Sequence, residues 1–325
     1  MRYDKPPLTF GQQLDLLAAR GLEVNPRDLA LHALERISYY RLSAYWYPVK
    51  NQDDTFRPGA RFDAALNLYE FDRHLRLQVM GAIERVEIAL RTAITYTLAH
   101  AYGTYAHTDS ANFRNTFQHA EWVGKAETEA RNSQEAFVEH FRKKYEGFPT
   151  LPIWMATEVI SLGSLSRLYE GMLPREQKQV AVDYRIHPSV LRSWFRTLTY
   201  VRNICAHHAR LWNRELSNAP ELPRHDRQWQ PPATPTNRRL FALLLMLRQM
   251  MARHHDGLHW QGRVTVLLEP IAAKKIFVRP WVCRMTGKPT PCGIALKPDP
   301  NTMNTQRCLK VVEFNEFKAD KEKRG

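Results

Sequence analysis

Arg202 and His207 stand five residues apart in the most basic part of the sequence, within Tyr200–Glu215 (YVRNICAHHARLWNRE). A histidine with a pKa near ~6.5 can accept or donate a proton at neutral pH. An arginine stays charged, holds phosphate oxygens and stabilises extra negative charge on them. Together the two residue types suit the cleavage of RNA. A solvated, charged helix face is the alternative that the same residues allow.

Helix geometry decides whether these side chains can act together. Asn203 and His207 are four residues apart and lie about 40° apart around a helix. Arg202 and His207 are separated by about 140° around the axis and by ~7.5 Å along it. One straight helix would not aim both at a small target, although a bend near its end or a second copy alongside would help. The spacing therefore predicts a composite site between two helices or two subunits.

The chain is strongly basic, with a formal net charge of +14 over 325 residues. The segment from Arg185 to Arg253 holds twelve arginines, no lysine and three acidic residues. Arginine binds phosphate with a bidentate fork and stacks on bases. This balance favours a polyanionic partner, either nucleic acid or an acidic membrane surface. Pairing of single arginines with acids elsewhere in the chain is the structural alternative.

Several functional classes find no support in the sequence. The first residues form no apolar signal segment, and the longest aliphatic run, Leu240–Leu247, is far shorter than the ~20 residues that span a bilayer. The four cysteines have no CxxC spacing, and no Walker or GxGxxG loop occurs. We therefore expect a cytoplasmic protein with no metal, no cofactor and no membrane partner.

Helical periodicity dominates and predicts an all-α fold. A capping box at Thr9–Gln12 predicts a short helix that stops at Gly21, and Asn25 is expected to cap a helix that runs to Ile37. The aromatic segment Ile37–Val49 lacks clean alternation and is expected to be a packed connector. Residues 62–101 have apolar residues at three- and four-residue steps without a proline, which predicts a long central helix. Further helices are expected at residues 120–145, 152–172, 174–184, 187–212 and 237–254.

Five segments carry a resemblance to a known family: ISYYRLSAYWYP, LYEFDRHLR, AIERVEIALR, LPIWMATEVISLGSLSRLY and VRNICAHHARLWNR. Together, over roughly residues 8–255, they resemble the Abi family of bacterial abortive-infection proteins, in its AbiD/AbiF-like group. RNICAH also fits the R-x(4–6)-H motif of HEPN ribonucleases.

The resemblance implies a function. HEPN domains are helical, commonly form homodimers that place two such motifs in one cleft, and in active members cleave RNA without a metal. By that pattern Arg202 and His207 are the catalytic pair and Asn203 is the polar residue that follows the arginine. The expected products are a 2′,3′-cyclic phosphate and a 5′-hydroxyl. Abi proteins imply toxicity triggered by phage infection, with growth arrest of the host.

The resemblance also suggests three parts. Residues 1–60 would be N-terminal helices and the aromatic connector, packed on a main domain. Residues 61–255 would be the HEPN-like helical bundle. Residues 256–325 depart from the family pattern and are expected to be an accessory or partly disordered tail.

Other residues near the motif receive weaker assignments. Asn203, His208 and Glu84 are expected to support the catalytic pair. The alternatives are that His208 only caps the negative end of the helix dipole and that Glu84 only belongs to a row of surface ion pairs. The arginines expected to contact RNA are Arg91, Arg196, Arg210 and Arg214.

Two main hypotheses follow. The first is a metal-independent endoribonuclease that acts as an anti-phage toxin. The second is a non-cleaving RNA-binding protein held in complex with a cognate small RNA of the antitoxin type, whose arginines serve phosphates only. A protein-interaction scaffold that uses the aromatic residues of Tyr39–Tyr47 is a third, weaker option.

Overall fold

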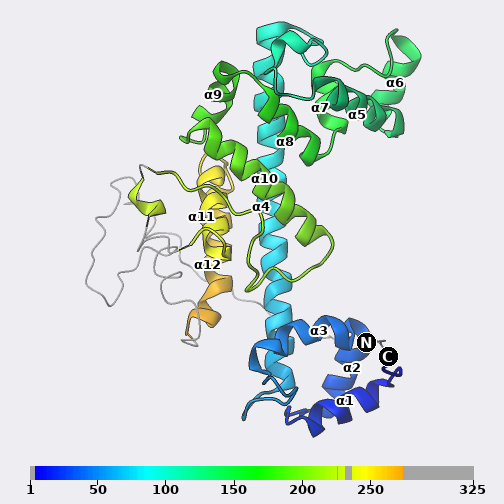
Figure 1. Ribbon diagram of the computed structural model, residues 1–325, viewed down its shortest axis with the longest axis vertical. Coiled ribbons are helices and arrows are strands. Elements are labelled where there is room, and N and C mark those ends of the chain that lie inside the picture. The colour runs from blue at the N-terminus through cyan, green and yellow to red at the C-terminus, as the bar shows by residue number, and fades with distance from the viewer. Residues whose placement is uncertain (1–3, 225, 231–235, 274–325) are drawn as a thin grey trace, which may run out of the picture. The chain divides into compact units, whose positions relative to one another are not determined.

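The computed structural model describes residues 4–224, 226–230 and 236–273. Within these residues the chain forms twelve α-helices, which confirms the predicted all-α class (Figure 1). The helices are α1 (Phe10–Ala19), α2 (Arg27–Ile37), α3 (Tyr39–Trp46), α4 (Phe62–Tyr102), α5 (His119–Asn132), α6 (Ala136–Lys144), α7 (Ile153–Val159), α8 (Leu162–Gly171), α9 (Pro174–Val182), α10 (Pro188–Ala206), α11 (Leu240–Met251) and α12 (Gly257–Ala273).

The first helices show how local signals act. Thr9 accepts a hydrogen bond from the Gln12 N–H while the Gln12 side chain accepts one from the Thr9 N–H, so the predicted capping box is confirmed. The prediction that Asn25 caps α2 was wrong, because Pro26 is the N-cap and no side chain bonds to that helix start.

The segment expected to be a packed connector is instead a helix, α3. Its buried residues, Leu42, Tyr45 and Trp46, follow the three- and four-residue spacing of one helix face. The aromatic composition concealed this period. Tyr40 and Tyr47 remain exposed on the outer side.

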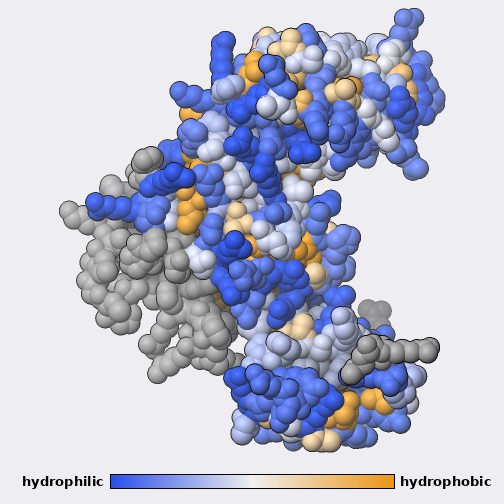
Figure 2. All heavy atoms as spheres, in the orientation of Figure 1, coloured by the Kyte–Doolittle hydropathy of each residue, from blue (hydrophilic) through white to orange (hydrophobic). Residues whose placement is uncertain are grey.

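The central helix α4 has the predicted start and extends to Tyr102. Its buried stripe includes Leu75, Val79, Ile83 and Leu90, and it packs against α3, α7, α9, α10 and α11. Figure 1 shows α10 and α11 beside the middle of α4. The space-filling view shows a mostly hydrophilic face with separate apolar patches (Figure 2). The core of the fold is thus arranged around α4.

Two of the predicted helices are broken. Residues 120–145 form α5 and α6, with Ser133 at the junction, and residues 152–172 form α7 and α8. At the second break the Ser161 hydroxyl accepts from the Ser164 N–H, and the Ser161 N–H donates to Glu129 of α5 at 2.7 Å. A contact from another helix therefore stabilises the break.

The C-terminal part begins with a helix that the sequence did not predict. Within α12, Trp260 is buried and its indole N–H donates to the Gln78 carbonyl at 2.8 Å. The chain divides into compact units at 1–267 and 268–325, and the second unit is described only to residue 273, the end of α12. The rest of the expected tail, 274–325, lies outside the described residues, and the domain boundaries at 60 and 255 stay predictions.

Candidate functional site

The motif residues lie at the C-terminal end of α10 and face solvent. Arg202, Asn203 and His207 are all exposed. The guanidinium of Arg202 donates to the Asn203 side-chain oxygen at 3.4 Å, a long hydrogen bond. No hydrogen bond in the described part of the chain joins Arg202 to His207. Both side chains are therefore available to a ligand or to another molecule.

The helix ends earlier than predicted. We expected it to continue to Trp212, but α10 stops at Ala206 and His207 is its C-cap. The His208 N–H bonds to the Cys205 carbonyl and the Ala209 N–H to the Ile204 carbonyl, both at 3.0 Å, which is a Schellman motif. His208 has a φ of +54°, a left-handed conformation that glycine usually supplies. Because a histidine holds this position, the sequence carried no stop signal.

Although α10 ends early, the side chains of Arg202 and His207 still point in different directions. The His207 N–H still bonds to the Asn203 carbonyl at 3.0 Å, as in a helix. Its Cβ therefore keeps its helical position, about 140° around the axis from that of Arg202. One copy of α10 still does not direct both side chains to a single small target.

The chain that follows the motif is attached to α3. Arg41 donates to the His208 carbonyl at 2.6 Å, and Arg210 donates to the Ala44 carbonyl at 2.9 Å. Arg214 in turn donates to the Arg210 carbonyl at 2.7 Å. Arg210 and Arg214, both expected to contact RNA, therefore also hold this loop. Backbone carbonyls beyond the end of a helix need such donors, or water, because no helix supplies them.

Asp72 of α4 is the centre of this attachment, and its side chain is fully buried. Its carboxylate forms an ion pair with Arg76 and accepts hydrogen bonds from the Tyr45 hydroxyl at 2.7 Å and the Trp212 N–H at 2.6 Å. The Leu211 N–H adds a longer bond, at 3.2 Å. Burial, together with the Asp72 charge, raises the pKa of Tyr45 well above its usual range, so this hydroxyl remains a donor. One carboxylate thus joins α3, α4 and the loop after the motif.

Sequence reasoning missed Asp72 and Arg76. Both lie in LYEFDRHLR, where they were used only as part of a resemblance. The signal that could have found them is their four-residue spacing on the same face as Leu75 and Val79. An acid and a base on an apolar stripe are buried together only as a pair.

Cys205 is not a nucleophile in this arrangement. Burial raises the pKa of its thiol to about 12. The thiol therefore stays protonated at neutral pH, and only a thiolate would attack or bind a metal. In the described part of the chain, no group of three or more His, Cys, Asp and Glu side chains is placed to hold a metal ion.

The remaining predicted residues form their polar contacts away from this loop. Arg196, half-exposed, forms an ion pair with Glu170 of α8. Arg91 is largely buried, pairs with Glu87 and donates to the Thr157 carbonyl. Glu84 is exposed on α4, and its side chain makes no hydrogen bond or ion pair with other described residues. Among the described residues, none of the three forms a hydrogen bond or ion pair with the side chain of Arg202 or His207.

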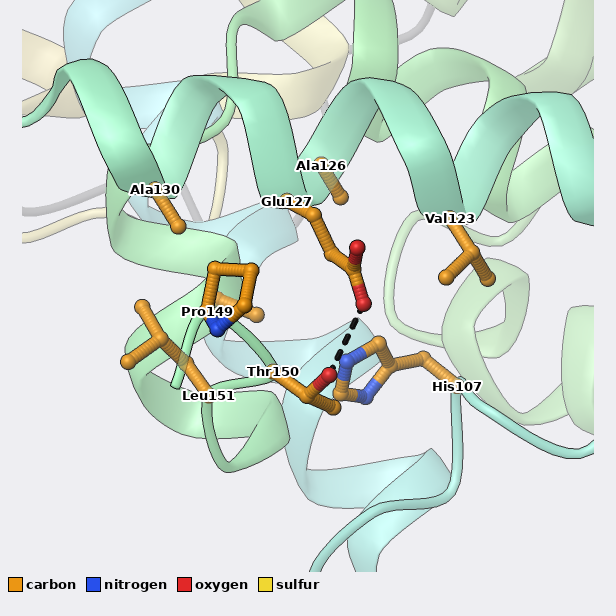
Figure 3. A pocket seen from close by; sticks show the side chains of 9 residues that line it. His107, Val123, Ala126, Glu127, Ala130, Pro149, Thr150 and Leu151 are labelled. Carbon is orange, nitrogen blue, oxygen red and sulfur yellow. Dashed lines mark hydrogen bonds between the residues drawn. The ribbon is translucent and has the colours of Figure 1, made fainter. Parts of the chain in front are cut away.

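A second candidate, the cavity beside His107, is too small for a substrate. It measures about 10 Å³, room for one water molecule, and is lined by residues of α5 and of the segment before α7 (Figure 3). His107 is buried, its Nδ1 has no hydrogen-bond partner among the described residues, and Thr150 donates to Glu127 beside the ring at 2.8 Å. Burial, with the nearby His119, lowers the pKa of His107 to about 4, so the ring is neutral.

Comparison with known proteins adds one finding. A family model described as Abi-like protein matches residues 32–213, from the middle of α2 through the loop that Asp72 holds. No curated protein and no solved structure matches the chain. Among the described helices, none combines the length and apolar character needed to cross a bilayer. The matched range contains Asp72 and Arg76 as well as the predicted pair, Arg202 and His207.

Proposed function

The chain belongs to the Abi-like protein family, and from this premise we propose that it acts in abortive infection as a metal-independent RNA endonuclease. Arg202 and His207 are the catalytic pair of this proposal, with Asn203 beside them. The observation that carries it is the contrast between the motif and its surroundings. The motif side chains are exposed, while the backbone that follows them donates hydrogen bonds to the buried carboxylate of Asp72. Exposed functional groups on a rigid support are what catalysis requires.

The chemistry assigns a task to each group. His207 takes the proton from a 2′-hydroxyl, whose oxygen attacks the neighbouring phosphorus. The bond from phosphorus to the 5′-oxygen breaks, and that oxygen receives a proton from a second imidazole, which starts the reaction in its protonated form. The products are a 2′,3′-cyclic phosphate and a 5′-hydroxyl, so protons and charge balance. Arg202 stabilises the negative charge that accumulates on the phosphoryl oxygens.

A second copy of the chain completes the site. One His207 cannot be base and acid on opposite sides of the phosphorus at once, and Arg202 diverges from it by about 140° around α10. Two copies of α10, side by side, supply two histidines and two arginines. The proposed enzyme is therefore a homodimer with one cleft.

The test compares wild type with Arg202→Ala and His207→Ala. Each variant is expected to lose at least about a hundredfold in RNA cleavage, the usual effect of removing a general acid–base group or a charge-stabilising donor. Both variants are also expected to lose toxicity in the producing cell. Excess chelator is expected to leave wild-type cleavage unchanged. Arg36→Ala and His32→Ala, exposed positions on α2, are the matched controls.

Two outcomes would count against the proposal. If both variants cleave RNA and arrest growth as wild type does, the motif is not the active site. If wild type retains an intact bound RNA after long incubation and releases it only as salt is raised, the non-cleaving RNA-binding protein is the better description.

A further inference from the structure

A second, larger hollow lies at the opposite end of α10 from the motif. It measures about 780 Å³ and lies between α9, the turn that follows it and the start of α10. Four cationic side chains line it: Arg114, Lys178, Arg185 and Arg192. A volume of this size is in the range of sites that hold small ligands or a few linked groups.

The charge of this pocket is unbalanced. No Asp or Glu is among its lining residues, and none of its four cations forms an ion pair with any other described residue. Like charges around one hollow repel one another and focus a positive potential into it. An anion in the pocket would remove that cost, whereas a neutral ligand would leave it.

One of the cations is held in position by the fold. The Arg114 guanidinium donates to the Met172 carbonyl at 3.0 Å and to the Gln177 side-chain oxygen at 2.8 Å. Gln177 is itself buried, and its amide donates to the Tyr169 carbonyl at 2.8 Å. The pocket therefore has one wall whose charge is fixed before any ligand arrives, which reduces the entropy lost on binding.

The pocket shares one face of α10 with Asn203 and His207 of the motif. Arg192 in the pocket, Arg196, Asn203 and His207 lie within about 60° of one another around the axis. Arg192 and His207 are about 22 Å apart along it, which is on the order of six nucleotides for a stacked strand that rises ~3.4 Å per phosphate, as one strand of a duplex does. No Phe, Tyr or Trp lines the pocket, so it offers no large aromatic ring on which a base could stack. These features fit a run of backbone phosphates better than a free nucleotide.

We propose that this cationic pocket binds backbone phosphates of single-stranded RNA at about six nucleotides from the bond that the motif cleaves. The choice of RNA as the ligand rests on the function proposed above. It assigns to Arg114, Lys178, Arg185 and Arg192 the task of holding the strand rather than any step of the chemistry. Affinity at this pocket would be independent of base sequence, because phosphates carry none.

The test measures binding separately from cleavage. Fully 2′-O-methylated RNA lacks the attacking hydroxyl, so wild type can bind it without cutting it. Fluorescence anisotropy at increasing KCl would compare strands of about five and about fifteen nucleotides, since only the longer strand spans the motif and the pocket. The variant is the double change Lys178→Ala with Arg192→Ala, and Lys143→Ala on α6, exposed and distant in sequence, is the control.

The expected result is specific to strand length. The double variant should bind the longer strand several-fold more weakly, and its salt slope should fall by about 1.4, which is about 0.7 for each lost phosphate contact. The shorter strand can bind at the motif without the pocket, so its affinity should fall less than that of the longer strand. Replacement of single phosphates by neutral methylphosphonates about six nucleotides from the cut should weaken wild type but not the double variant.

The contrary results are equally distinct. Unchanged affinity and salt slope of the double variant for the longer strand would overturn the proposal. So would loss of ATP binding in that variant with RNA binding intact, which would assign the pocket to a nucleotide. Wild type that binds the longer strand through the pocket but never cleaves unmodified RNA would refute the endonuclease and leave the pocket standing. If wild type cleaves RNA but the pocket variant binds the longer strand as wild type does, the endonuclease would stand and the pocket proposal would be refuted.

Discussion

The carboxylate of Asp72 accepts a hydrogen bond of 2.6 Å from the backbone N–H of Trp212, which lies 140 positions further along the chain. This bond joins the long central helix α4 to the loop that follows the motif. The same carboxylate pairs with Arg76, and Arg41 holds the His208 carbonyl from α3. The backbone around His207 is therefore positioned by residues from the first quarter of the chain.

Replacement of Asp72 is expected to destabilise the protein strongly. Asp72→Ala leaves the buried Arg76 charge without its partner, and it leaves the N–H groups of Leu211 and Trp212 without an acceptor. Breaking one side of a buried ion pair costs about 3–5 kcal/mol. Urea unfolding should record a loss of this size in the free energy of unfolding. Asp63→Ala removes an exposed pair with Arg61 on the same helix and should change stability by less than about 1 kcal/mol; equal losses in both variants would show that Asp72 has no special place.

His208 is expected to contribute through its backbone rather than its ring. Its left-handed φ strains any residue with a Cβ, and its carbonyl accepts from Arg41. His208→Gly should therefore raise the free energy of unfolding by up to about 1 kcal/mol and retain RNA cleavage. His208→Ala removes the ring but keeps the strain, so it should retain cleavage without the gain in stability. A tenfold or larger fall in cleavage in both variants would show that the imidazole takes part.

His107 is expected to make stability depend on pH in the acid range. Burial holds its pKa in the folded protein at about 4, below the ordinary value of 6.5. As pH falls below about 6.5, the unfolded chain binds a proton here that the folded protein does not bind until about pH 4. The contribution of this residue to the free energy of unfolding should therefore decrease by up to about 3 kcal/mol as the pH is lowered from about 6.5 to about 4. Above pH 6.5 this contribution should not change. His107→Phe should remove this part of the dependence in urea titrations, whereas His32→Gln on the surface should not; parallel curves for wild type and His107→Phe would contradict the assignment.

Local patterns predicted those parts of the fold whose stabilising contacts are local. The capping box at Thr9 and the uninterrupted period of α4 depend on neighbours three or four residues away. The break before α8 was missed because Glu129, 32 positions earlier, bonds to the Ser161 N–H. The period of α3 was present in Leu42, Tyr45 and Trp46, but its aromatic composition favoured another interpretation.

The candidate site divides in the same way. The prediction that one helix carries Arg202 was correct, since short spacings are local, but the end of that helix at Ala206 was not predicted. The attachment of the loop to Asp72 joins residues 140 positions apart, and no local pattern specifies it. The pocket at the other end of α10 brings Arg114 to Lys178 and Arg192, which is a consequence of packing and not of spacing.

Mixing wild type with an inactive variant is expected to lower cleavage by more than dilution does if the active site combines two chains. His207→Ala keeps both arginines of a dimer but removes its imidazoles. A mixed dimer of wild type and this variant has one imidazole, which cannot be base and acid on opposite sides of the phosphorus at once. When equal amounts are denatured and refolded together, about a quarter of the dimers hold two intact chains, so cleavage should fall to about a quarter of that of wild type alone. A size measurement should report dimers in every sample. Cleavage that falls only to about half, in a sample shown by two distinct tags to contain mixed dimers, would place a complete active site within each chain.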